Sequence, residues 1–232
     1  MSNSEWCMDK LPIGHEMMVR SEDLTIEISR MPEDEERSLL LYGNLNAYFY
    51  DGSDDNGDFE SRKIGVIKAG IFDLHKYDSP FDLETGVFSS HGEVDALRPL
   101  FHDRESIMDT AKLNKPRIKG LGGKANKPRV MYIDLIYTHQ QIASRNFGFL
   151  LCVEFCRLVF DIFGRLPVMS YLGAYDNSLD GSLVVRYLER QGFAKVERGS
   201  WHLPFETIQY SPCLWDQELR VRERGRKSNK HD

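Results

Sequence analysis

An arginine and a glycine three positions apart, Arg145 and Gly148, are the residues whose types and spacing best suit chemistry. They separate an apolar stretch typical of a strand, residues 129–137, from one typical of a helix, residues 147–164. A helix that starts against the end of a strand leaves its first N–H groups without acceptors, and its dipole favours an anion. Gly148 has no Cβ to keep a ligand from the backbone. The pattern predicts a pyrophosphate site, or else a tight turn with an incidental arginine.

The neighbouring stretches must position this turn. Residues 130–137 form a continuous apolar run with one acid, which is typical of a central strand covered on both faces. After the helix, Gly164 suits a helix end, and residues 166–175 predict a second buried strand. A strand, a helix and a strand in this order predict a parallel βαβ unit with a right-handed crossover.

The rest of the chain supplies further strands and one more helix. Residues 24–29 alternate apolar and polar side chains, as a half-buried strand does. Two strand-like stretches, residues 45–51 and 61–74, flank an acidic segment that predicts a long hairpin loop. That loop is either a solvated tip or a rim that attracts a cationic acceptor.

A second helix is predicted over residues 181–191. Gly192 should end it, and Phe193 can fold back as the apolar partner of a Schellman cap. A final hairpin should follow around residues 194–205, where Gly199 suits the first position of a type II′ turn.

Length and composition limit the class of protein. The chain has 232 residues, of which 41% are hydrophobic, so it can bury a sizeable core. We expect a single domain over residues 1–232, with an insertion at about 77–127 and a flexible C-terminal tail at 217–232. No run of 18 apolar residues and no signal-peptide layout appear, which predicts a cytoplasmic protein that binds no membrane. The net charge of −6 argues against a dedicated nucleic-acid binder.

A cysteine pair and a basic segment each allow more than one interpretation. Cys152 and Cys156 lie four residues apart on the apolar helix without histidines at metal-ligand spacing, so we expect core thiols and no metal. Residues 112–129 are rich in lysine and arginine and contain no acid. This segment is either a solvated loop or a site for an anionic partner.

A family resemblance adds to these patterns. The stretch 145–150 resembles the R/Q-x-x-G-x-G/A signature of the GNAT superfamily of N-acetyltransferases. The flanking strands, the helix after Gly148 and the later helix with its Gly-Phe ending are also similar to that family in order and spacing. The resemblance covers roughly residues 129–205, and more loosely the strands at 24–74.

The resemblance implies an α/β (α+β) fold and an activity. The sheet would be mixed and mostly antiparallel, flanked by helices, with a parallel βαβ unit at the cofactor site. The activity would be acyl-CoA-dependent N-acyl transfer, most simply from acetyl-CoA to a primary amine that attacks directly. The sequence does not identify this amine-bearing acceptor.

The same resemblance implies two groups of cofactor-binding residues. Backbone donors near Ile136 and Tyr137 would face the thioester carbonyl. Backbone amides of the signature would hold the pyrophosphate, and these residues are Arg145, Asn146, Phe147, Gly148, Phe149 and Leu150. Leu150 stands where the family prefers glycine or alanine, so its side chain is expected to crowd or redirect the pyrophosphate.

The resemblance also suggests an acid that protonates the leaving thiolate. The family often places a tyrosine four residues before the glycine of Gly-Phe, and here that position is Leu188. Tyr187, one residue earlier, is the candidate acid or a core tyrosine. Tyr171 and Tyr175 are rivals.

Asp134 and His139 are the candidates for the base. Asp134 interrupts an apolar strand, which a structural hydrogen bond explains as well as catalysis does. His139 has a suitable intrinsic pKa but is expected to be a solvated loop residue. A water-relayed base is a further option. The alternative function is a catalytically inactive GNAT-like protein that binds a protein or a nucleic acid, favoured by Leu150 and the displaced tyrosine.

Overall fold

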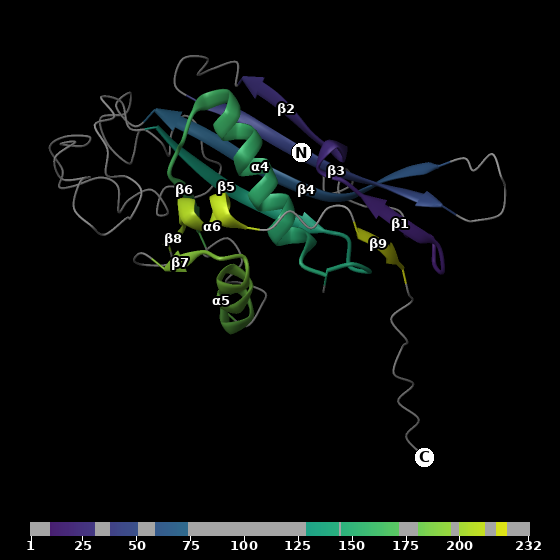
Figure 1. Cartoon of the computed structure of the whole chain (residues 1–232). Coiled ribbons are helices and arrows are strands. Elements are labelled where there is room, and N and C mark those ends of the chain that lie inside the picture. Colours follow the sequence, from purple (N-terminus) through teal and green to yellow (C-terminus); the bar gives the residue numbers. More distant parts are fainter. Residues whose placement is uncertain are drawn as a thin grey trace, which may run out of the picture.

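In the computed structural model, one continuous sheet holds all of the described strands, and a long helix lies across one of its faces (Figure 1). The described residues are 10–30, 38–50, 59–73, 129–143, 145–171, 181–195, 200–211 and 217–221. Among them, no helix has both the length and the apolar character needed to cross a bilayer.

The sheet has nine strands in the order β7-β8-β6-β5-β4-β3-β1-β9, with β2 also paired to β3. The strands are β1 (Glu16–Val19), β2 (Leu24–Arg30), β3 (Ser38–Tyr50), β4 (Glu60–Asp73), β5 (Arg129–Thr138), β6 (Val168–Tyr171), β7 (Ala194–Lys195), β8 (Ser200–Leu203) and β9 (Gln217–Arg220). β5 and β6 are parallel, and every other described pair is antiparallel. The predicted fold class, a mixed and mostly antiparallel sheet with one parallel unit, is confirmed.

Helix α4 (Phe147–Phe163) connects the two parallel strands, as the sequence predicts. It ends at Gly164, which has a φ of 78° and whose N–H bonds to the Phe160 carbonyl at 2.9 Å. With its ψ of 174°, this positive φ gives a conformation that essentially only glycine adopts, so Gly164 stops the helix and lets the chain turn back to β6.

The face of the sheet under α4 is the main core. Phe155 of α4 packs against β3 at Gly43, where a Cβ would lie 2.6 Å from the Phe155 ring and 2.5 Å from Ile67. Glycine is therefore required at this strand position for the helix to approach closely. Cys152 and Cys156 are buried and free, which confirms core thiols, and burial raises the pKa of the Cys156 thiol well above its usual value.

Helix α5 (Gly181–Arg190) ends in the predicted Schellman cap. The Phe193 N–H bonds to the Leu188 carbonyl at 3.0 Å, and the Gly192 N–H bonds to the Glu189 carbonyl at 3.0 Å. Phe193 is buried and is the apolar partner of the cap. The predicted turn at Gly199 lies outside the described residues.

The first hairpin is longer than predicted. β3 begins at Ser38 instead of Leu45, and it pairs with β4 as far as Phe49 opposite Glu60. The acidic segment 51–58 and the insertion at 77–127 lie outside the described residues.

The C-terminal part of the chain contains two elements that the sequence analysis missed. Residues 217–220, which we expected to belong to a frayed tail, form β9 at the edge of the sheet beside β1. The short helix α6 (Phe205–Tyr210) packs on α4. Both elements are short, and their pairing partners are far away in sequence, so no local periodicity reveals them.

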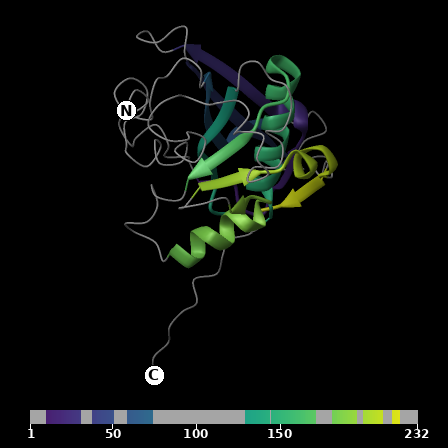
Figure 2. The ribbon, with the colours of Figure 1, turned by 90° about the vertical axis from the view of Figure 1, so that its left-hand side faces the viewer.

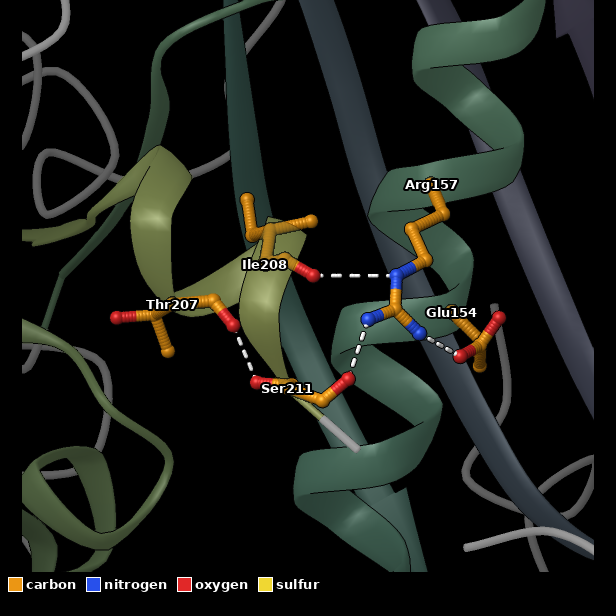
Figure 3. Close-up of polar contacts among 5 residues, drawn as sticks. All are labelled: Glu154, Arg157, Thr207, Ile208 and Ser211. Atoms are coloured by element: carbon orange, nitrogen blue, oxygen red, sulfur yellow. Dashed lines mark hydrogen bonds and ion pairs between the residues drawn. The ribbon is translucent and has the colours of Figure 1, made fainter. Parts of the chain in front are cut away.

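Arg157 of α4 fastens α6 to the long helix (Figure 3). Its Nε donates to the Ile208 carbonyl at 3.1 Å, and its Nη2 donates to the Ser211 carbonyl at 2.6 Å. Its Nη1 pairs with Glu154, and the Ser211 hydroxyl donates to the Thr207 carbonyl. The last carbonyls of a helix lack partners within it, and here an arginine supplies them.

Candidate functional site

Within the described residues, the pairing of the parallel strands β5 and β6 ends before β5 does. Their pairing runs from Met131 opposite Val168 to Ile133 opposite Ser170. Tyr171, the last residue of β6, pairs with Ser200 of β8, and β5 continues to Thr138 beside β4. Within the described residues, the edge of β5 beyond Ile133 therefore has no strand on the β6 side.

A β-bulge marks the point of separation. In the register between β4 and β5, Ala69 faces Ile133 and Lys68 faces Leu135, so Asp134 is the extra residue. The Lys68 Nζ donates to the Asp134 carboxylate at 2.7 Å, and both side chains are half-buried. This ion pair explains why a carboxylate interrupts an apolar strand.

The open edge of β5 carries backbone donors. The His139 N–H bonds to the Ile64 carbonyl of β4 at 2.8 Å. Successive N–H groups of a strand alternate between its two sides, so the N–H groups of Ile136 and Thr138 face the open edge. The Tyr137 N–H faces β4. This alternation favours the Ile136 N–H over the Tyr137 N–H as a hydrogen-bond donor to a ligand carbonyl. The Thr138 N–H faces the same side, and the sequence analysis did not name it.

The first turn of α4 has an unusual backbone. Asn146, the residue before the helix, has a left-handed conformation with φ 59° and ψ 13°, the single positive φ of a non-glycine residue in the described part of the chain. The Leu150 N–H bonds to the Asn146 carbonyl at 3.1 Å, so the N–H groups of Gly148 and Phe149 precede the first bond of the helix. A left-handed residue followed by a helical one turns consecutive N–H groups toward one concave side, where anions bind.

Leu150 does not obstruct this turn. Its side chain is buried in the core cluster beneath α4, together with Ile142 and Leu151. The expected crowding of a pyrophosphate by Leu150 is therefore wrong, because the helix directs this side chain toward the sheet.

The guanidinium of Arg145 has a structural partner. Its Nη2 donates to the Arg220 carbonyl of β9 at 2.7 Å, which ties the start of α4 to the edge strand. The arginine side chain has five N–H donors, so one bond to a carbonyl leaves capacity for an anion.

Two side chains lie against Gly148, Tyr187 of α5 and Gln191, the residue that follows this helix. A Cβ on Gly148 would lie 3.0 Å from the Tyr187 hydroxyl, 3.5 Å from Gln191 Nε2 and 3.8 Å from Gln191 Oε1. The Tyr187 hydroxyl thus lies beside the first turn of α4 (Figure 2 shows the two helices from the side). Gln191 is buried, and the sequence analysis missed it because nothing in the pattern of α5 sets it apart.

The loop between β5 and α4 holds the N-terminal part of the chain. Gln141 Oε1 accepts from the Leu11 N–H at 2.7 Å, and Gln141 Nε2 donates to the Leu11 carbonyl at 3.3 Å. His139 is buried, and its Nδ1 accepts from the Gln141 N–H at 3.3 Å. The expectation that His139 is solvated is therefore wrong.

Other candidates lie partly or wholly outside the described residues. Tyr175 and nearly all of the basic segment 112–129 belong to this group, and the side chain of Tyr171 is not described. Within the described ranges, no group of three or more histidine, cysteine, aspartate or glutamate residues could hold a metal ion.

Comparison with known proteins finds structural likeness at low similarity. The KacTA–DNA complex matches over 80% of this chain and 96% of that chain, with 10% identity and a TM-score of 0.35. An AtaT mutant toxin bound to the C-terminus of the antitoxin AtaR and acetyl-CoA matches over 81% of this chain and 96% of that chain, with 9% identity and a TM-score of 0.34. A structure of AtaTR bound with acetyl-CoA matches over 81% and 97%, with 9% identity and a TM-score of 0.34.

No protein-family model and no curated protein sequence matches the chain. At TM-scores this low, structural likeness says nothing of activity. The function is therefore inferred from the site itself.

Proposed function

We propose that the protein is an acyl-CoA-dependent N-acyltransferase that most readily transfers an acetyl group from acetyl-CoA to a primary amine. The observation that carries the proposal is the start of α4, where the left-handed Asn146 precedes a glycine at Gly148 beside the open edge of β5. Backbone N–H groups would hold both an anion at this turn and an acyl group at the open edge.

The pyrophosphate would lie on the amides of residues 145–150, and the missing Cβ of Gly148 lets the Tyr187 hydroxyl and Gln191 approach the same turn. The arm that bears the thioester would follow the open edge of β5, and the Ile136 N–H would donate to the thioester carbonyl. A donor directed at this oxygen stabilises the negative charge that develops when the amine attacks. Holding both substrates in line supplies a further part of the rate.

Two residues are proposed to handle protons or bind the cofactor. Asp134, at the bulge and paired with Lys68, would accept the ammonium proton directly or through water. For Tyr187, the resemblance implies an acid. The position of its hydroxyl at Gly148 favours a donor to the phosphate instead.

The alternative function is a catalytically inactive binding protein, and one of the two observations that favoured it does not hold in the structure. It was favoured by Leu150 and by the displaced tyrosine, and Leu150 lies in the core away from the turn. The displaced tyrosine, Tyr187 beside Leu188, remains its one support.

Isothermal titration calorimetry tests the proposal. The chain should bind acetyl-CoA, CoA or a longer acyl-CoA, and release of free CoA thiol in the presence of a panel of primary amines should identify the acceptor. Absence of binding to all three ligands at millimolar concentration would contradict the proposal.

A further inference from the structure

Two buried side-chain atoms in the described ranges have no hydrogen-bond partner, Gln191 Oε1 and Trp201 Nε1. Gln191 is 6% exposed, so water does not replace the missing partner freely. A buried carbonyl oxygen without a donor costs free energy and is rare in folded proteins. A ligand with a hydrogen-bond donor at this place would satisfy the Gln191 oxygen.

The position of Gln191 is set by the helix end. It lies between the last turn of α5 and Gly192, inside the Schellman cap that fixes the backbone here. Gln191 and Tyr187 are four residues apart and share one side of α5. Both reach the same place, the missing Cβ of Gly148 at the first turn of α4.

The polarity of the unpaired atom restricts what can bind it. An amide oxygen accepts hydrogen bonds and donates none. The phosphate oxygens proposed to lie at this turn are also acceptors, so they cannot pair with Gln191 Oε1. The ligand must carry a hydroxyl or an amide N–H close to its phosphate.

The burial of the site indicates which part of the ligand carries this donor. Asn146, at the same turn, is exposed, whereas Gln191 is buried. The nucleotide of a CoA ligand would extend outward from the turn, and the arm that carries the thioester would extend inward. That arm has a hydroxyl and an amide N–H within a few bonds of the pyrophosphate.

We propose that Gln191 is a specificity-determining residue, whose side-chain carbonyl accepts a hydrogen bond from the hydroxyl or amide of the pantetheine arm. The proposal rests on the proposed function and adds a selection for CoA esters over nucleotides that share only the adenine and pyrophosphate.

Replacing Gln191 should change the stability of the free protein in opposite directions, depending on whether its role is structural or in binding. If the oxygen is unpaired in the free protein, replacing the amide with an apolar group of similar shape removes a desolvation cost. Gln191→Met should then leave the free protein as stable or make it more stable, and should weaken binding of the ligand. Such opposition is typical of residues kept for function.

The experiment compares Gln191→Met with the wild type by calorimetry and thermal unfolding. Acetyl-CoA should bind on the order of tenfold more weakly to the variant, the loss of one buried hydrogen bond. ADP, which lacks the pantetheine arm, should bind equally to both proteins. The melting temperature of the free variant should equal or exceed that of the wild type. Glu189→Met, on the exposed side of α5, is the matched control and should change neither affinity.

Three results would overturn the proposal. Unchanged acetyl-CoA affinity in Gln191→Met would show that the oxygen makes no bond to the ligand. An equal loss of acetyl-CoA and ADP affinity would place the donor on the nucleotide. A lower melting temperature of the free variant would show that the oxygen has a partner within the protein. A wild type that binds no CoA compound would instead contradict the proposed function, before any variant is compared.

Discussion

The two ends of α4 differ in how completely their polar groups are paired. In the second half of the helix, the Arg157 guanidinium contacts Glu154 and the carbonyls of Ile208 and Ser211 (Figure 3). At the first turn, the helix presents N–H groups beside the open edge of β5, and Gln191 Oε1 is buried without a partner.

This difference in pairing indicates that Arg157 has a structural role and that the first turn of α4 is the place where a ligand binds. A guanidinium that donates to three protein groups has little left to offer a ligand, and its removal leaves buried carbonyls and a carboxylate unpaired. Groups that are buried and unpaired cost stability in the free protein, so they are informative about a ligand. If this comparison is right, substitutions near α6 should change the stability of the protein, and substitutions at the first turn of α4 should change ligand binding.

The largest effect is expected for Arg157→Met, which removes all three contacts and retains the apolar stem. The free energy of unfolding should fall by about 3 kcal/mol, because charge-assisted hydrogen bonds are lost and their acceptors remain. Acetyl-CoA affinity of the folded protein should not change. Urea unfolding measures the first quantity and calorimetry the second.

Arg186→Met, on the exposed side of α5, is the control and should change stability by less than about 0.5 kcal/mol. A comparable small change in Arg157→Met would mean that the contacts in Figure 3 do not fasten α6.

Low pH should reduce the stability of the region around α6 through His202, a buried residue of the neighbouring strand β8. Burial lowers the pKa of His202 from 6.5 to about 4, with Glu206 raising it and Arg165 lowering it further. In that pH range the unfolded chain binds a proton that the folded chain refuses, so stability falls as pH drops from 6.5 toward 4. The loss attributable to this residue should be roughly 2–3 kcal/mol.

The measurement is urea unfolding of the wild type and of His202→Gln across this pH range. The variant should have the flatter pH profile, since glutamine does not titrate. Parallel profiles for the two proteins would show that His202 is protonated in the folded state.

Glycine-to-alanine substitutions at the two ends of α4 should have opposite readouts. In Gly148→Ala the new methyl group would lie 3.0 Å from the Tyr187 hydroxyl and occupy the space beside the backbone. Acetyl-CoA affinity should fall roughly tenfold, about 1.4 kcal/mol, with little change in melting temperature. In Gly164→Ala, the φ of 78° should cost about 1 kcal/mol of stability and leave the affinity unchanged.

Both affinities and both melting temperatures are obtained from calorimetry and thermal unfolding. Equal affinities of the two alanine variants for acetyl-CoA would show that Gly148 is not part of the binding site.

The smallest effect is expected for Tyr187→Phe. Loss of a hydroxyl that donates to the phosphate should raise KM for acetyl-CoA about fivefold and leave kcat within about twofold. Steady-state kinetics with an identified amine acceptor measures both constants. A fall in kcat at constant KM would instead support the tyrosine as the acid that protonates the thiolate.

Much of the fold could be predicted from the sequence. The apolar runs and their lengths indicated β5 and α4 close to their observed bounds and a strand at the place of β6, and glycines at positions 164 and 192 marked two helix ends. Elements without such local signals were missed. β9 is four residues long, and it forms because β1, some two hundred positions earlier in the chain, offers it a strand edge.

That the candidate site lies at this turn stays a prediction. The structure places Arg145 after β5 and Gly148 in the first turn of α4, as the sequence indicates. The sequence did not reveal that Leu150 faces the core, that the Arg145 guanidinium bonds to β9, or that Gln191 reaches Gly148. Each of these depends on which distant element packs against the turn.

By itself, the sequence determined where β5 and α4 form, where α4 and α5 stop, and that a glycine-containing turn follows a buried strand. These features follow from side-chain periodicity and backbone freedom, which involve only neighbouring residues. The tertiary structure alone decided which polar atoms are paired. A hydrogen bond requires two groups to meet, and for Asp134, Arg157 and Gln191 the group that is present or missing belongs to another part of the fold.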